Sequence, residues 1–79
     1  MALKVLLAAT LRKYVAGYDA SVGYPMEVSP GDTPRVVARR LGIPEEEVKL
    51  LMVNGIGATW DTALEGDERV ALFPPVGGG

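Results

Sequence analysis

The sequence predicts an α+β fold, in which one main helix crosses a mixed sheet of four to five strands. Two observations lead to this fold class. The predicted elements run in the order strand, strand, helix, strand, strand, strand, with one clear amphipathic helix in the middle. The first and last strands are also rich in apolar residues, as is typical of strands at the centre of a sheet.

The first half of the chain predicts two strands. The first covers residues 3–9, which are almost all apolar. Residues 11–16 predict a short helical turn that ends at Gly17, and a loop of small and polar residues follows. The second strand covers residues 24–28, with Pro25 near its start, where a missing N–H does least damage to a sheet.

The main helix follows a turn at residues 29–32. Thr33 suits the N-cap position and Pro34 the first helical position, since neither place needs an intrahelical N–H. Gly42 suits the position just after the last helical turn. The apolar stripe of this helix consists of Val36, Val37 and Leu41.

The second half predicts the remaining strands. Residues 43–47 predict a further turn of helix with carboxylates at its positive end. Residues 48–53 form the third strand, and Asn54 and Gly55 are typical of a two-residue hairpin turn. Residues 56–60 would return as a short strand, and residues 69–73 form the last strand.

This order of elements is the β-grasp arrangement of ubiquitin-like proteins. A right-handed crossover lets the first and last strands lie parallel at the centre of the sheet, where both would be fully buried. A split β-α-β sheet would need a second long helix, which the sequence does not supply. We therefore expect a β-grasp domain over residues 1–73 and a flexible tail over residues 74–79.

The composition excludes several kinds of function. The chain of 79 residues has no Cys and no His, which excludes thiolate nucleophiles, Ser-His-Asp triads, disulfides and the usual zinc sites. We therefore predict that it is not an enzyme and binds no metal or cofactor itself. The net charge of −2 provides no basic field for nucleic acid or a membrane surface, and we expect a cytoplasmic protein.

The final stretch, FPPVGGG, is the candidate functional segment of the chain. Pro74 and Pro75 favour an extended conformation that holds the tail off the domain. Glycines have no Cβ and fit a narrow channel in a partner, so Gly78 and Gly79 suit a reactive end. The α-carboxylate of Gly79 is the group available for activation, first as an acyl-adenylate and then as a thiocarboxylate or an isopeptide. The alternative is a disordered end, which the stiff Pro-Pro spacer disfavours.

These residues resemble the MoaD/ThiS-type sulfur carriers, and most closely the small subunit of molybdopterin synthase. The resemblance rests on Val53-Asn54-Gly55, on Gly66-Asp67 and on the FPPV-x-GG pattern at residues 73–79. The departures are a long loop at residues 18–24, Trp60 in place of a smaller residue, and glycine at the variable position of the tail pattern.

The resemblance implies a pathway and partners. An E1-like adenylating enzyme would use ATP and Mg to activate Gly79, and a sulfurtransferase would supply the sulfur. The tail would then thread into the large catalytic subunit of molybdopterin synthase, which builds the ligand of molybdenum or tungsten. The residues that would thread are Pro74, Pro75, Val76, Gly77 and Gly78. Phe73 and Leu72 are candidates for partner docking, with core packing as the alternative for both.

Three other functions stay open at this stage. The chain could carry sulfur for thiamine, cysteine or tRNA thiolation, because such carriers share the tail. A ubiquitin-like modifier would form isopeptides on lysines from the same activated carboxylate. A β-grasp interaction module would leave the tail inert.

Overall fold

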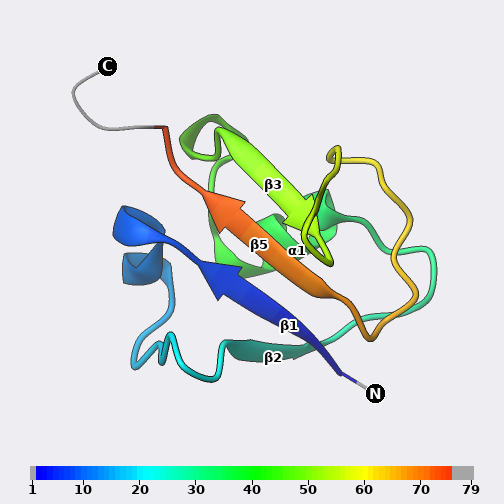
Figure 1. Cartoon of the computed structure of the whole chain (residues 1–79), viewed down its shortest axis with the longest axis horizontal. Coiled ribbons are helices and arrows are strands. Elements are labelled where there is room, and N and C mark those ends of the chain that lie inside the picture. The colour runs from blue at the N-terminus through cyan, green and yellow to red at the C-terminus, as the bar shows by residue number, and fades with distance from the viewer. Residues whose placement is uncertain (1, 76–79) are drawn as a thin grey trace.

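The computed structural model describes residues 2–75, in which five strands form one mixed sheet with the α-helix on one face (Figure 1). The strands are β1 (Ala2–Leu7), β2 (Tyr24–Glu27), β3 (Leu50–Val53), β4 (Ile56–Gly57) and β5 (Arg69–Phe73). Their order across the sheet is β2-β1-β5-β3-β4. The central pair β1 and β5 is parallel and the other pairs are antiparallel. The predicted β-grasp fold is confirmed.

The helical elements are the 3-10 helices η1 (Ala9–Tyr14) and η2 (Glu45–Glu47) and the α-helix α1 (Pro34–Leu41). The ends of α1 lie where the sequence predicts them. Thr33 is the N-cap with extended backbone, although its side chain makes no capping hydrogen bond. Gly42 has a left-handed φ of 77°, and its N–H donates to the carbonyls of the last turn.

The core lies between α1 and one face of the sheet. The strands contribute alternate residues, because successive side chains point to opposite faces. The buried strand residues are Leu3, Val5, Leu7, Met26, Leu51, Val70 and Leu72. From α1 the buried residues are Pro34, Val37 and Ala38, while Val36 and Leu41 of the predicted stripe are only half-buried.

The prediction that β1 and β5 are fully buried was wrong. Lys4 and Arg69 are exposed, and Leu6 and Ala71 are half-buried, in alternation with fully buried neighbours. The physical reason is that α1 covers one face of the sheet only (Figure 1). We call the other face, opposite α1, the open face.

Several strand ends also differ from the prediction. β1 ends at Leu7 because Ala9, with a φ of 49°, already begins η1. β3 begins at Leu50, two residues later than expected, since η2 and its C-cap Val48 precede it. β2 ends at Glu27, one residue early.

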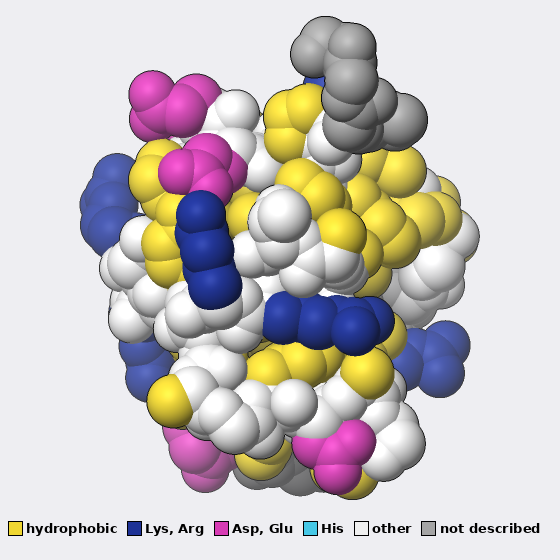
Figure 2. All heavy atoms as spheres, turned by 90° about the vertical axis from the view of Figure 1, so that its left-hand side faces the viewer, with side chains coloured by type: hydrophobic (Ala, Val, Ile, Leu, Met, Phe, Trp, Pro, Cys, Tyr) yellow, Lys and Arg dark blue, Asp and Glu magenta, His cyan; other side chains and the backbone are white. Residues whose placement is uncertain are grey.

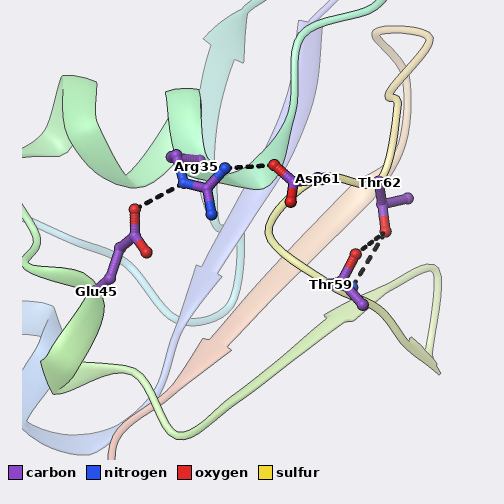
Figure 3. Close-up of polar contacts among 5 residues, drawn as sticks. All are labelled: Arg35, Glu45, Thr59, Asp61 and Thr62. Atoms are coloured by element: carbon purple, nitrogen blue, oxygen red, sulfur yellow. Dashed lines mark hydrogen bonds and ion pairs between the residues drawn. The ribbon is translucent and has the colours of Figure 1, made fainter.

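The return strand β4 is shorter than predicted. It stops at Gly57, although the N–H of Ala58 still donates to Leu51 O at 3.1 Å. The chain then turns at Thr59, whose N–H donates to Thr62 Oγ1 at 3.1 Å (Figure 3). This local hydrogen bond competes with the ladder, as is usual for threonine in turns.

Arg35 holds this turn against the rest of the domain (Figure 3). Its Nε donates to Glu45 Oε2 at 2.8 Å, and its Nη1 donates to Asp61 Oδ1. Its backbone N–H donates to Trp60 O at 3.3 Å. The first turn of α1 therefore fixes both η2 and the loop that returns to β5.

Candidate functional site

The central strand β5 is hydrogen-bonded on both sides up to its last residue. The N–H of Ala8 donates to Leu72 O at 3.1 Å, and the N–H of Lys49 donates to Phe73 O at 2.8 Å. Pro74 has no N–H, so it cannot continue the ladder. Pro74 is half-buried and Pro75 is exposed. The chain thus leaves the sheet at once after Phe73, at the end of its central strand.

Four predicted tail residues, Val76, Gly77, Gly78 and Gly79, lie outside the described residues. Their role in threading stays a prediction, as does the division into a domain and a tail. Pro74 and Pro75 are described, and both lie beyond the end of β5.

Leu72 and Phe73, the two predicted docking residues, face opposite sides of the sheet. Leu72 has no exposed surface and packs in the core beneath α1, so we withdraw it as a docking residue. Phe73 is half-buried on the open face, directly opposite Leu50, which is 48% exposed. Phe73 remains a candidate because the residue is only partly buried.

Phe73 belongs to an apolar strip along the open face. The register places Leu6 beside Ala71, Ala71 beside Met52, and Phe73 beside Leu50. The view onto the side where β5 ends shows hydrophobic side chains at the surface in its upper half, with basic side chains across its middle (Figure 2). The residues paired by this register form what we call the apolar strip: Leu6, Leu50, Met52, Ala71 and Phe73.

Leu50 and Met52 were not expected from the sequence to lie at the surface. A signal for them was present, because they alternate with Leu51 and Val53 in a four-residue strand. A strand with two apolar residues on each face must leave one pair uncovered when a helix covers only one face of the sheet. The register with β5 then decides which pair this is.

The end of β1, beside the end of β5, is held by side chains from η1 and the following loop. The N–H of Leu7 donates to the hydroxyl of Tyr18 at 2.8 Å, and Arg12 Nε donates to Leu7 O at 3.1 Å. Arg12 also lies over the Tyr18 ring, 5.8 Å from its centre. These contacts satisfy both backbone groups of Leu7 where the strand ends.

A weaker contact joins η1 to η2. Lys13 Nζ lies 3.9 Å from Glu47 Oε1, and both side chains are largely exposed, so this ion pair adds little stability. A hydrogen bond with the Glu47 carboxylate raises the pKa of Tyr14 above its ordinary value. The rim around the end of β5 thus carries the cations Arg12, Lys13 and Lys49 together with the carboxylate of Glu47.

Glu68, which directly precedes β5, has a structural role. Its carboxylate accepts hydrogen bonds from the N–H groups of Glu65 (2.7 Å), Gly66 (2.9 Å) and Asp67 (3.2 Å). Burial raises the pKa of this carboxyl, but the backbone hydrogen bonds outweigh burial, and the pKa of Glu68 is lowered. The side chain is therefore a structural anion in the turn before β5.

Comparison with known proteins identifies the family. The model of the Mut7-C ubiquitin family matches residues 1–77, nearly the whole chain. The chain belongs to the Mut7-C ubiquitin family. The crystal structure of SAMP1 from Haloferax volcanii has the same fold, with a TM-score of 0.72 and 19% sequence identity over 100% of both chains. No curated protein matches the chain.

The expected ubiquitin-like identity is thus confirmed for this Mut7-C ubiquitin. Within residues 2–75, no group of three or more His, Cys, Asp or Glu side chains is arranged to hold a metal ion. Over the same residues, no helix has the length and apolar character needed to cross a membrane. What the site offers chemically is an apolar strip, a rim of mixed charge and a chain that leaves from a fixed point.

Proposed function

We propose that this Mut7-C ubiquitin is a sulfur carrier for molybdopterin synthesis. In this proposal the α-carboxylate of Gly79 is adenylated and then converted to a thiocarboxylate. The observation that supports it is the exit of the chain from β5, which is fixed on both sides through Phe73 and released at Pro74. The five residues from Pro75 onwards span roughly 17 Å when extended, enough to reach a buried active site.

The chemistry requires little of this chain. The Gly79 carboxylate attacks the α-phosphorus of ATP and pyrophosphate leaves. A persulfide on a sulfurtransferase then displaces AMP, and a thiol reduces the resulting acyl disulfide to the thiocarboxylate. A chain without cysteine suits these steps, because an internal thiol would attack the activated acyl group.

The proposal assigns three partners. An E1-like adenylating enzyme binds ATP and Mg and activates the tail, and a sulfurtransferase delivers the sulfur. The large catalytic subunit of molybdopterin synthase then takes up the thiocarboxylate. Phe73, half-buried beside the exposed Leu50, lies at the base of the tail and would dock each partner.

The decisive test starts from protein isolated from its native cell. Intact mass spectrometry should show a fraction in which one oxygen is replaced by sulfur, on a chain that ends at Gly79. With the purified adenylating enzyme, deletion of Gly79 should abolish ATP–pyrophosphate exchange, while Gly77→Ala should retain it. Full exchange by the deletion variant would end the proposal.

The pathway needs its own test. The thiocarboxylated chain should convert the pyranopterin precursor to molybdopterin when mixed with the large catalytic subunit. Failure with this subunit, together with turnover by a thiamine, cysteine or tRNA-thiolating enzyme, would move the carrier to that pathway.

Membership of a ubiquitin family favours a protein modifier as the second candidate. The same Gly79 adenylate would then be attacked by a lysine amine and give an isopeptide. Branched peptides ending in Gly79 on other proteins of the native cell would support this function. Their absence, with sulfur present on Gly79, would leave the carrier function alone.

A further inference from the structure

Two cations occupy directly opposed positions on the open face. Lys4 of β1 is the register partner of Arg69 of β5, and both side chains are exposed. Neighbouring strands lie about 4.8 Å apart, and like charges directly opposite each other destabilise a sheet. The repulsion between Lys4 and Arg69 therefore lowers the stability of the free chain, and the fold does not require two cations at these positions.

No carboxylate of the described residues forms an ion pair with either cation. The ion pairs within residues 2–75 involve Lys13 and Arg35 instead. Glu27, on the same face, is the register partner of Ala2, diagonal to Lys4. Glu68 directly precedes Arg69, but its carboxylate is occupied by backbone N–H groups. Among the described residues, Lys4 and Arg69 thus have no carboxylate partner within ion-pair distance.

The loop before β2 packs against Lys4. Gly23 is buried there, and a Cβ built on it would lie 3.0 Å from Lys4 Cγ and 2.9 Å from Leu6 Cδ2. The stem of Lys4 is thus confined beside Leu6 before any partner binds, which lowers the entropy lost on binding. Val22, which precedes Gly23 in the chain, is 54% exposed.

We propose that Lys4 and Arg69 bind a pair of carboxylates on the partner protein whose apolar side chains cover the strip from Leu6 to Phe73. The proposal rests on the proposed function, because the partner meant is the adenylating enzyme that activates the tail. Arg69 and Phe73 stand at the two ends of β5, about 13 Å apart at 3.3 Å per residue. The partner would thus hold β5 along its length, with charge at the far end from the tail.

A protein fits this surface better than a nucleic acid. A polyphosphate backbone needs a row of cations, and the open face offers two next to a strip of apolar side chains. Apolar strips flanked by charge are typical of protein interfaces, where opposite charges raise the association rate and set the partner choice. The chain's net charge of −2 also repels a polyanion.

The test uses a substitution that separates folding from docking. Lys4→Glu places an opposite charge beside Arg69, so the thermal midpoint of the free chain should rise. The same change should weaken binding to the purified adenylating enzyme by roughly fivefold or more. Arg39→Glu, on the exposed side of α1, changes the net charge equally and should leave binding as in the original chain.

Binding is measured by titration calorimetry of the full chain at low and high salt, without ATP. The affinity of the original chain should fall with salt, and that of the Lys4→Glu variant should fall less. Equal affinities of the two chains, or an equal loss with Arg39→Glu, would refute the inference. ATP–pyrophosphate exchange is measured separately. If the chain supports exchange but Lys4→Glu does not weaken binding to the adenylating enzyme, the docking proposal alone is refuted. If Lys4→Glu weakens binding but the original chain supports no exchange, the proposed function alone is refuted.

Discussion

Asn54 and Arg69 bind each other through two hydrogen bonds. The backbone N–H of Asn54 donates to Arg69 O at 2.8 Å, and the backbone N–H of Arg69 donates to Asn54 Oδ1 at 2.9 Å. Asn54 has a φ of 54° and Gly55 a φ of 80°, as a two-residue hairpin turn requires. The turn between β3 and β4 is thereby tied to the first residue of β5.

Asn54→Ala should lower the free energy of unfolding by about 2 kcal/mol. Alanine tolerates a positive φ less well than asparagine, and the N–H of Arg69 loses its side-chain acceptor. Urea unfolding followed by circular dichroism measures the change. Asn54→Gly is the matched control, because it keeps the turn geometry and loses only the acceptor. It should cost about 1 kcal/mol. Equal losses in the two variants would show that the backbone angle does not contribute.

Gly23→Ala should destabilise the chain more than Gly17→Ala. Both glycines have positive φ, 81° and 72°, so both substitutions carry about 1 kcal/mol of backbone strain. Only at Gly23 would the new Cβ approach Leu6 and Lys4, at 2.9 and 3.0 Å, and the Val5 carbonyl oxygen at 3.2 Å. At Gly17 nothing lies within 4 Å. Thermal unfolding of the two variants compares them directly, and equal midpoints would contradict the close packing of the loop on β1.

Local signals in the sequence were enough to predict much of the fold. Pro34 and Gly42 mark the ends of α1, and Asn54 with Gly55 marks the hairpin, because each residue type suits one backbone geometry. The order of elements then left the β-grasp sheet as the arrangement with parallel central strands.

The sequence did not reveal which side chains the fold leaves uncovered. Leu72 and Phe73 are equally apolar, and their exposure depends on which face of β5 meets α1. The alternation of Val70 and Leu72 with the charged Arg69 favours burial of Leu72, but the neighbours of Phe73 depend on the register with β1 and β3, which lie far from β5 in the chain. The opposed pair of Lys4 and Arg69 was missed for the same reason, since 65 positions separate them in the chain.

Leu72→Ala should lower the free energy of unfolding by about 2–5 kcal/mol, because it leaves a cavity in a core where Leu72 has no exposed surface. Leu50→Ala, at a position 48% exposed on the open face, should cost below about 1 kcal/mol. Chemical denaturation at several urea concentrations measures both. A small loss at Leu72 would show that its side chain is not part of the core, and would restore it as a docking candidate.

Glu68→Gln should reduce the dependence of stability on acid pH. The pKa of Glu68 is lowered from its ordinary value of 4.5, because backbone N–H groups bind the ionised carboxylate in the folded chain. A group with a lowered pKa contributes stability that is complete above its unfolded pKa and is lost as the pH falls through the folded pKa. The original chain should therefore lose stability below about pH 4.5.

The glutamine variant cannot ionise, so it should be less stable at neutral pH and change less between neutral and acid pH. Thermal midpoints across this range measure the difference. Glu65→Gln is the matched control, because Glu65 lies in the same turn with its side chain exposed. Its curve should keep the slope of the original chain. If Glu68→Gln loses stability on acidification as steeply as the original chain does, other carboxylates govern acid unfolding, and the anion in the turn before β5 is not the group that acid removes.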